Sequence, residues 1–361
     1  SIYKDLKKPN APKVTHLINK GDLVVTEPMV AHTMVFRKDS IFLNLVKGER
    51  EHKNYGKTHT IPYELINKRE KEFIFKNYKD KCRVCGENDF LRCISLGYQP
   101  LANNFANSPE KLERYPLEVN VCKSCRNGQL SILPNFKKIF SKYLYKSSIS
   151  IIFKKHFEKA AKKYINLFNI KKNDLIIDIG SNDGIGLIPF KELGFKNILG
   201  IEPANNLAKE TRKIGIRTIN RFFNEKINSL IKDKAKLIMA SNVFAHADNL
   251  HELIQTMKKI LKPKGKIIIE VQYFPKMLKD FTFDNIYHEH VNYWSMQALN
   301  KFCKLNGLKI FKVDEIDTHG GSIRVYITKE KKIKIESSVN KILKKESIIG
   351  ILEDKIFLNY G

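Results

Sequence analysis

Short apolar runs alternate with segments of helical periodicity between residues 174 and 271. The runs are Leu175–Ile179, Ile198–Ile201, Ile216–Ile219, Leu237–Ala240 and Lys266–Val271. Strands that are apolar on both faces and separated by helices are typical of a parallel sheet buried between two helical layers. The pattern therefore predicts an α/β fold with a doubly wound sheet in this part of the chain. A further helical stretch is expected at 137–170.

A different pattern occupies the N-terminal residues. An alternating strand at Thr33–Leu45 follows a segment rich in turn residues at 21–32, and this arrangement resembles the second half of a cupin jelly roll. A jelly roll needs about eight strands, so we interpret residues 1–62 as a partial cupin-like β segment. We expect the chain to begin inside a domain. The highly charged residues 63–81 are predicted to form a linker.

Cys82, Cys85, Cys122 and Cys125 form two C-x-x-C pairs. Two thiolates at this spacing can bind one metal ion from a tight turn, so two pairs supply the closed tetrahedral set of thiolates that is usual for structural zinc. Such a site keeps no open coordination position for a substrate. We therefore predict a four-cysteine zinc-binding module at 82–135 whose metal stays out of the chemistry.

The composition favours a globular protein with several modules. The chain has 361 residues, of which 42% are hydrophobic, and a formal net charge of +27. The lysines are spread along the whole chain, so solvated lysine-rich surfaces explain the charge better than nucleic-acid binding does, and attraction of an anionic small substrate is an alternative. No apolar run approaches the roughly 18 residues of a membrane helix, and metal spacing of the cysteines fits a reducing compartment. We expect a cytoplasmic protein without a membrane partner, and the oligomeric state is unknown.

A glycine turn follows the first predicted strand. Asp178, Gly180, Asn182 and Gly184 lie in it, and Glu202 comes directly after the next strand. Glycines permit a sharp turn and close approach of the backbone to a ligand, and the carboxylate can accept hydrogen bonds from the ribose of an adenosine group. NAD is the competing interpretation, but its G-x-G-x-x-G fingerprint is absent and the spacing is G-x-x-x-G. The turn with its later acid resembles motifs I and II of class I S-adenosylmethionine (SAM) methyltransferases.

A second dense cluster of polar residues lies at Tyr287–His290. Two imidazoles beside a carboxylate suit general acid–base catalysis near neutral pH. A metal site and an ordinary surface loop are equally compatible with the composition of this segment. Residue types alone leave these three interpretations open.

A family resemblance separates them. From about residue 80 to residue 328, the chain resembles SAM-dependent sugar C-methyltransferases that act on nucleotide-linked 4-keto-deoxysugars. Besides the cysteine pairs, the matching segments are Gln99–Phe105, Tyr143–Ser148, Asp178–Gly184, Asn242–His246, Tyr287–His290 and His319–Arg324. The resemblance implies a Rossmann-like class I domain, with SAM as cofactor, zinc in the cysteine module and a nucleotide-diphosphate 4-keto-deoxysugar as substrate.

The resemblance also implies a set of catalytic residues. His290 would be the base that removes the proton on C3, next to the C4 ketone of the sugar. Tyr287 and Glu289 would shape the site, and His246 would lie at the ketone or enolate oxygen. Tyr145 would close the pocket. His288 is expected to be structural.

Further consequences concern the cofactor and the domains. Asn242, after the fourth predicted strand, is expected to contact SAM together with the glycine turn. The methyltransferase domain is placed at 136–300, and residues 301–361 are interpreted as the start of a C-terminal domain that is longer in the family. The zinc module is expected to hold a lid that faces the substrate. We therefore expect the chain to be a fragment or one piece of a bifunctional protein.

Two other functions are compatible with the sequence. An O-methyltransferase acting on a sugar or small acceptor needs a base but no ketone. A zinc-knuckle protein that binds nucleic acid is favoured only by the net charge.

Overall fold

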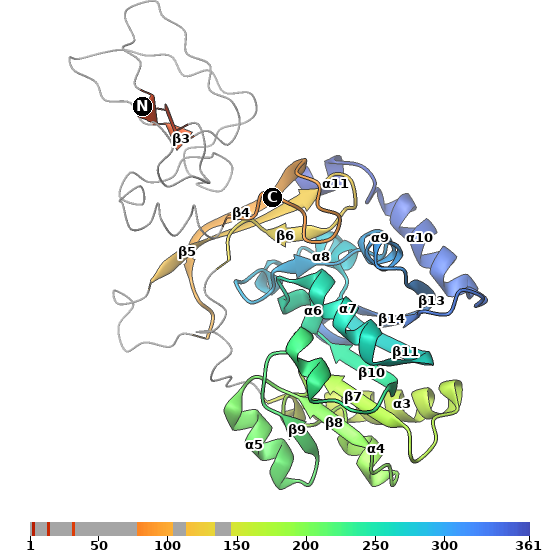
Figure 1. Cartoon of the computed structure of the whole chain (residues 1–361). Helices are drawn as coiled ribbons and strands as arrows, with labels where there is room; N and C mark the ends of the chain where they lie inside the picture. Colours follow the sequence, from red (N-terminus) through yellow and green to blue (C-terminus); the bar gives the residue numbers. More distant parts are fainter. Residues whose placement is uncertain (1, 4–12, 15–30, 33–77, 104–112, 134–145) are drawn as a thin grey trace, which may run out of the picture.

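A seven-stranded sheet forms the centre of the molecule (Figure 1). The computed structural model describes residues 2–3, 13–14, 31–32, 78–103, 113–133 and 146–361. The strand order is β13-β14-β11-β10-β7-β8-β9. The strands are β7 (Leu175–Ile179), β8 (Ile198–Ile201), β9 (Arg217–Ile219), β10 (Ala235–Ser241), β11 (Leu261–Gln272), β13 (Lys309–Ile316) and β14 (Ser322–Thr328). Strands β7 to β11 are parallel, and β14 is antiparallel to both of its neighbours.

The doubly wound α/β sheet predicted from the apolar runs is confirmed. Strands β7 and β8 have the predicted bounds, and β9, β10 and β11 overlap the other three runs. Strand β14 was missed, although it inserts between β11 and β13 and all of its residues are buried. The domain boundary that we placed at residue 300 falls inside helix α9 (Met296–Leu305). Because β13 and β14 complete the central sheet, the segment up to residue 328 belongs to this sheet and does not start a separate domain.

Helices cover both faces of the central sheet (Figure 1). Their bounds are α3 (Ile151–Phe168), α4 (Ile188–Glu192), α5 (Asn205–Lys213), α6 (Val243–His246), α7 (Leu250–Ile260), α8 (Phe274–Asp280), α9, α10 (Ser337–Ile349) and α11 (Lys355–Leu358). Side chains alternate along β7, so Ile176 belongs to the core cluster that includes residues of α3 and α4, and Ile177 belongs to the cluster that includes residues of α7 and α9. None of the helices in the described ranges is long and apolar enough to cross a membrane.

Helix α3 shows why these elements form where they do. Its buried residues Ala160, Ala161, Tyr164 and Phe168 recur at helical spacing on one face. The Ser150 side chain accepts a hydrogen bond from the backbone of Phe153 and caps the N-terminus. Of the helical stretch predicted at 137–170, the structure shows a helix over Ile151–Phe168. Residues 137–145 lie outside the described ranges.

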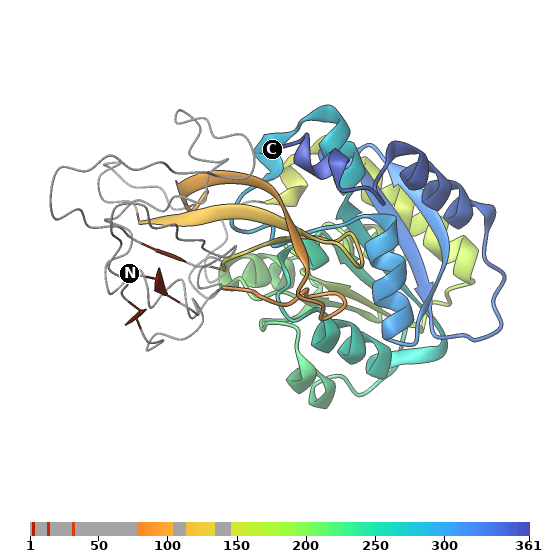
Figure 2. The ribbon, with the colours of Figure 1, turned by 90° about the horizontal axis from the view of Figure 1, so that it is seen from above.

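A second, four-stranded sheet lies next to the cysteine pairs, of which Cys122 ends one of its strands. Its order is β12-β6-β5-β4, with β4 (Phe90–Pro100), β5 (Arg114–Cys122), β6 (Gly128–Leu130) and β12 (Asn292–Tyr293). Figure 2 shows the long orange and yellow strands of this sheet beside the main body of the molecule. Strand β12 comes from the C-terminal half of the chain, so the small sheet is assembled from two distant segments.

The N-terminal predictions fall largely outside the described residues. Three two-residue strands, β1 (Ile2–Tyr3), β2 (Lys13–Val14) and β3 (Ala31–His32), pair in antiparallel fashion. The cupin-like segment and the linker at 63–81 stay predictions.

A buried carboxylate fixes the start of α9. Glu346 of α10 accepts hydrogen bonds from the backbone N–H groups of Met296 at 2.6 Å and Gln297 at 3.0 Å. Ser295 accepts another from Ala298. Burial raises the pKa of Glu346 to about 7, although the two backbone donors oppose the shift. Glu346 thereby joins α10 to the start of α9.

Replacing this carboxylate should destabilise the fold. Glu346→Ala leaves two helix N-terminal N–H groups without an acceptor in a buried site, so we expect a loss of about 2–4 kcal/mol in the free energy of unfolding. Urea unfolding followed by circular dichroism measures it. The exposed neighbour Lys344 provides the control, since Lys344→Ala should change stability by about 0.5 kcal/mol or less. Equal effects of the two substitutions would contradict the anchoring role.

Candidate active site and zinc cluster

The four cysteines of the two C-x-x-C pairs meet in space. Their Sγ atoms all lie within 4.8 Å of one another. Cys82 Sγ is 3.5 Å from Cys125 Sγ, and Cys85 Sγ is 3.5 Å from Cys122 Sγ. Three of the four side chains are buried. Four soft thiolates at this separation fit one tetrahedral zinc ion, and they leave no position for a substrate.

The two C-x-x-C turns, which we call knuckles, have the same backbone geometry. The N–H of Gly86 bonds to the carbonyl of Cys82, and the N–H of Arg126 bonds to the carbonyl of Cys122. Gly86 has φ +80° and Arg126 has φ +61°, so each turn ends in the left-handed conformation. Each turn presents two thiolates at short separation, which is why the C-x-x-C spacing is typical of a metal-binding turn.

The knuckles are anchored to the central domain. Arg83, 7% exposed, donates from Nε to Asp248 Oδ1 at 2.9 Å and from Nη1 to the carbonyl of Leu130 at 3.0 Å. Asp248 follows α6 and also pairs with Lys79. Burial alone would raise the pKa of Asp248, but Arg83 and Lys79 lower it. The cysteine module is therefore joined to the central domain by the ion pairs of Asp248 and by packing in a common core.

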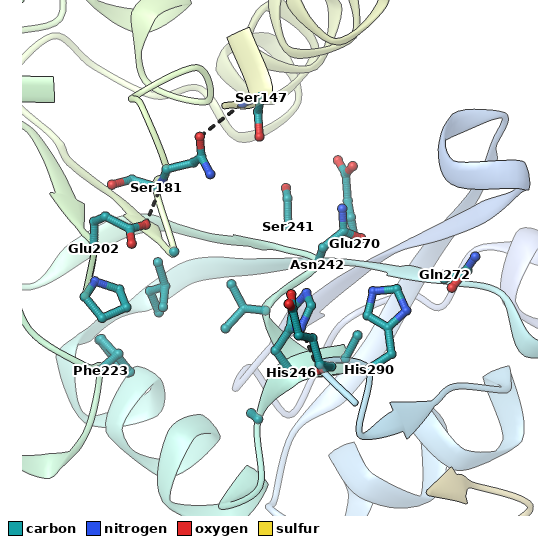
Figure 3. A pocket seen from close by; sticks show the side chains of 18 of the residues that line it. Ser147, Ser181, Glu202, Phe223, Ser241, Asn242, His246, Glu270, Gln272 and His290 are labelled. Atoms are coloured by element: carbon teal, nitrogen blue, oxygen red, sulfur yellow. Dashed lines mark hydrogen bonds between the residues drawn. The ribbon is translucent and has the colours of Figure 1, made fainter. Parts of the chain in front are cut away.

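A cavity of about 790 Å³ lies at the carboxyl ends of the central strands (Figure 3). Ligands of open α/β sheets bind at this edge. Gly180, Glu202, Asn242, His246 and His290 are among the lining residues. The structure thus brings the predicted cofactor residues and the predicted catalytic histidines to one cavity.

The glycine turn has the conformation that its residues predict. Gly180 has φ +66° and Gly184 has φ +88°, which favour glycine, and Asn182 has φ +49°. A Cβ on Gly180 would lie 2.7 Å from Val243 Cγ2. The turn therefore needs glycine both for its dihedral angles and for its closeness to α6.

Glu202 is tied to the glycine turn. Its carboxylate accepts from the N–H of Asn182 at 2.9 Å and from the N–H of Ala204 at 2.8 Å. Burial raises its pKa to about 7, and the two backbone donors act in the opposite direction. The carboxylate is fixed at the cavity wall, where its remaining lone pairs can accept the hydroxyl groups of a ribose.

Asp178 is a buried residue of β7, directly before the glycine turn. It is 5% exposed, and burial raises the pKa of its carboxyl group, with further increases from Glu202 and Glu270. A Cβ on Gly186 would collide with its carboxylate. Gly186 was missed from the sequence, although its place two residues after Gly184 extends the glycine pattern.

Asn242 lies between the cofactor turn and the histidines. It has φ +60° and starts α6, and its N–H donates to the carbonyl of Glu270 at 2.8 Å. His246 is the last residue of the same short helix. One turn of helix therefore sets the spacing between the predicted SAM contact and the predicted catalytic imidazole.

The two histidines of the cavity have defined hydrogen-bond partners. His246 Nδ1 lies 2.7 Å from the carbonyl of Glu289, and His290 Nδ1 lies 3.0 Å from the carbonyl of Asn285. A carbonyl only accepts, so both Nδ1 atoms carry the proton and both Nε2 atoms of the neutral rings are acceptors. The ring centroids are 4.9 Å apart. Tyr287 donates from its hydroxyl to His290 Nε2 at 3.0 Å.

The polar cluster divides between the cavity and the small sheet. Glu289 is 3% exposed and accepts a short hydrogen bond from Asn103 Nδ2, which brings the tip of the cysteine module to the cavity. His288 points away and lies 3.2 Å from the carbonyls of Tyr115 and Pro116 in β5. Burial lowers the pKa of His288. Its contacts are those of a structural residue.

Some lining residues were not predicted and one predicted residue is not described. His156 of α3 and Glu270 of β11 line the cavity. A glutamate inside the apolar run of β11 was a usable signal, whereas His156 carried none. Tyr145 lies outside the described residues.

Comparisons with known proteins agree with this geometry. Residues 153–313 match the family described as "Methyltransferase domain", and residues 82–140 match the family described as "Putative zinc binding domain". The C-methyltransferase NovU of Streptomyces niveus is 32% identical over 253 residues, which are 68% of this chain. The chain spans 60% of the length of that relative.

Two solved structures are similar at lower identity. A SAM-dependent methyltransferase from Clostridium acetobutylicum is 14% identical, with 48% of this chain and 91% of that chain covered and a TM-score of 0.40. Magnesium protoporphyrin IX methyltransferase from Synechocystis, solved with bound S-adenosylhomocysteine (SAH), is 11% identical, with 54% and 92% covered and a TM-score of 0.40. At these scores neither likeness informs on substrate.

One assignment follows from the sheet order, the glycine turn with its acid, the cysteine cluster and the two family matches. The chain thus carries a methyltransferase domain of class I fold, and a four-cysteine zinc-binding module lies ahead of it in the sequence.

Proposed function

We propose that this protein transfers the methyl group of SAM to C3 of a nucleotide-linked 4-keto-deoxysugar. The observation that carries the proposal is the pair of cavity histidines, each with Nδ1–H on a backbone carbonyl and Nε2 as an acceptor. The similarity to a C-methyltransferase supports it. Methyl transfer to carbon requires removal of a proton from carbon, and this arrangement supplies bases in the wall of the cofactor cavity.

The ketone makes this proton removable. A hydrogen on C3 is acidified because the carbanion left behind is delocalised onto the C4 oxygen as an enolate. SAM supplies an electrophilic methyl group to that carbanion. The task of the protein is to hold the ring in place, accept the C3 proton and stabilise the oxygen anion.

The hydrogen bonds suggest how the residues share this task. His290 accepts the C3 proton at Nε2, and its Nδ1–H on Asn285 stabilises the resulting imidazolium. The Tyr287 hydroxyl, which bonds to the same Nε2, can turn to the sugar oxygen when substrate enters and so frees the base. His246 can donate from Nε2 to the enolate only as an imidazolium, because its Nδ1–H is already placed on Glu289.

The zinc module contributes to this site through its protein contacts. Asn103 orients the Glu289 carboxylate, and the metal holds the fold from which Asn103 extends. The prediction that Tyr145 closes the pocket is retained as part of the proposal. Reduced thiolates are required for zinc, which fits our proposal of a cytoplasmic protein.

The described walls of the cavity lack the cationic side chains that bind phosphate groups. Among the described residues that line it, none is lysine or arginine, in spite of the net charge of +27. A nucleic-acid backbone needs cationic contacts. We therefore place the sugar ring in the cavity and the diphosphate beyond its described walls.

Cofactor binding should depend on Glu202. Glu202→Gln keeps the size of the side chain but removes an anionic acceptor, so we expect SAM binding to weaken about tenfold by calorimetry at pH 8. The pKa of about 7 implies that affinity for SAM falls in the wild type as the pH drops below 7, since the protonated acid accepts less well. Glu202→Gln should lack this dependence. Exposed Glu192 is the control, and Glu192→Gln should bind SAM as the wild type does.

Proton removal should depend on His290. In deuterated water with SAM and TDP-4-keto-6-deoxyglucose, the wild type should exchange the C3 proton and add a methyl group to C3, seen by NMR and mass spectrometry. His290→Ala should slow C3 exchange by about 10²–10⁴-fold while SAM binding changes about twofold or less. Undiminished exchange in His290→Ala would show that another group is the base. Exchange and methylation at C5, the other carbon beside the ketone, would contradict the C3 assignment, and methylation at oxygen would contradict C-methylation.

The zinc content should depend on the four cysteines, whereas the affinity for SAM should not. Cys122→Ser removes one of four ligands, so we expect zinc content by plasma mass spectrometry to fall well below one ion per chain. SAM affinity should stay within a few-fold, because the cofactor residues belong to the central sheet. Cys303→Ala, at a buried thiol outside the cluster, should keep its zinc. Full zinc retention in Cys122→Ser would rule out the four-thiolate site.

A further inference from the structure

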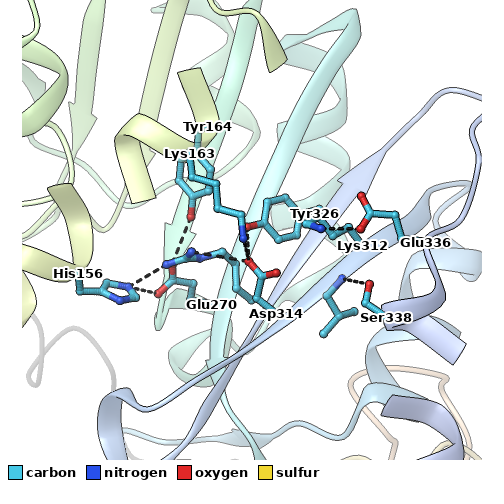
Figure 4. A network of polar contacts seen from close by, with 11 residues as sticks. His156, Lys163, Tyr164, Glu270, Lys312, Asp314, Tyr326, Glu336 and Ser338 are labelled. Atoms are coloured by element: carbon cyan, nitrogen blue, oxygen red, sulfur yellow. Dashed lines mark hydrogen bonds and ion pairs between the residues drawn. The ribbon is translucent and has the colours of Figure 1, made fainter. Parts of the chain in front are cut away.

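A second cavity of about 560 Å³ lies against a buried polar network (Figure 4). Residues of α3, β13 and β14 line it. Glu270 lines the cofactor cavity, Arg324 lines the second cavity, and His156 lines both. The bonded pair of Glu270 and Arg324 therefore stands between the two cavities. None of these residues has a role in the proton transfer proposed above.

A row of charges across the sheet forms one wall of the second cavity. Arg324 of β14 is in register with Glu270 of β11 on one side and with Asp314 of β13 on the other. Arg324 donates from Nε to Glu270 Oε1 at 2.5 Å, and its Nη2 lies 3.0 Å from His156 Nε2. Its Nη1 lies 4.0 Å from Asp314 Oδ2, which is beyond hydrogen-bond distance. This end of the guanidinium can therefore donate to a ligand.

The acidic residues around the cavity have cationic partners within the protein. Asp314 accepts from Lys163 Nζ and from the Tyr326 hydroxyl, each at 2.5 Å. Burial alone would raise the pKa of Asp314, but these hydrogen bonds lower it, so the carboxylate stays charged and paired. Glu315 forms an ion pair with Lys345 of α10. The acids of this cavity are thus compensated before any ligand binds.

Lys159 supplies a positive charge that the network does not use. It lies one turn after His156 on the same side of α3, lines the second cavity and is exposed. It forms no ion pair with any of the residues that the structure describes. Between residues 154 and 163, the helix carries five lysines and a single acidic residue, Glu158. This excess of positive charge attracts anions to the cavity.

We propose that the second cavity binds a free phosphate ion or a small phosphomonoester between Arg324 and Lys159. A guanidinium presents N–H donors in a planar fork that matches a tetrahedral oxyanion, and the ammonium group adds a second charge. Two cationic groups from different elements suit a dianion better than a singly charged carboxylate.

The proposed phosphate site is separate from the site of methyl transfer. Figure 3 shows the Glu270 carboxylate on the side of Ser147, with His246 and His290 on the opposite side of the strand ends. The second cavity lies behind Glu270, on the side of Arg324. A phosphate bound there contacts neither the ribose carboxylate nor the predicted base, so the inference goes beyond the proposed methyl transfer.

An NMR titration of the zinc-loaded full chain with inorganic phosphate, at constant ionic strength, tests the site. The ring signals of His156 should shift and saturate, whereas those of His251, which lines neither of the two cavities, should stay in place. Lys159→Gln should weaken phosphate binding about fivefold through loss of one charge-assisted contact. Arg324→Lys should weaken it about tenfold or more, because an ammonium group lacks the planar fork.

Matched controls locate the bound phosphate. Lys162→Gln removes an exposed lysine of the same helix that does not line the cavity, and it should change the affinity about twofold or less. Saturation with SAH should leave phosphate binding in place. No saturable shift at His156, equal effects of Lys159→Gln and Lys162→Gln, or displacement of phosphate by SAH would overturn the site.

Calorimetry with TDP-4-keto-6-deoxyglucose separates this ligand from the proposed methyl acceptor. Lys159→Gln should bind the nucleotide sugar as the wild type does. A loss of that affinity in parallel with the loss of phosphate binding would assign the cavity to the diphosphate of the acceptor and would contradict a separate site. Because the phosphate titration requires no methyl transfer, its failure leaves the test of C3 methylation unaffected.

Discussion

The structure depends on the backbone hydrogen bonds that flank Val291. Its N–H donates to the carbonyl of Ala245 in α6 at 2.7 Å, and its carbonyl accepts from the N–H of Leu130 in β6 at 3.0 Å. The next residues form β12, which pairs with β6 through Asn292 and Gln129. The chain that leaves the cluster Tyr287–His290 is therefore bonded to the central domain on one side and to the zinc module on the other.

This double attachment connects the metal module to the methyltransferase domain at the cluster Tyr287–His290. The imidazole of His246 is fixed by the carbonyl of Glu289, and the carboxylate of Glu289 is fixed by Asn103 from the module. His288 adds a bond to β5. Displacement of the small sheet would move these partners together. The zinc can thus affect the predicted catalytic groups through geometry alone, without contact with a substrate.

Sequence patterns predicted the parts of the structure that depend on local chemistry. The apolar runs located β7 and β8 at their observed bounds, and the C-x-x-C spacing located the thiolate cluster. Strand β14 was not predicted because its place depends on insertion between two strands that are distant in sequence. His156 was not predicted because an amphipathic helix gives no indication of which polar residue faces a cavity.

Some predictions were limited in other ways. Glu270 interrupts an apolar strand and could have been recognised as a candidate, but its partner Arg324 is set by antiparallel register with β14. The domain boundary at 300 was wrong because the chain continues through α9 into the central sheet. The catalytic roles came from family resemblance, and the structure adds to them the tautomers of His246 and His290.

Hydrogen exchange of the loop at 283–293 with and without zinc tests the central claim most directly. If the module holds this loop, chelation of zinc should remove the protection of the Leu130 and Val291 amides together, while the amides of β7 and β10 remain protected. Retained protection of Val291 after complete removal of zinc would show that the central domain alone positions the loop at 283–293, and it would contradict the account.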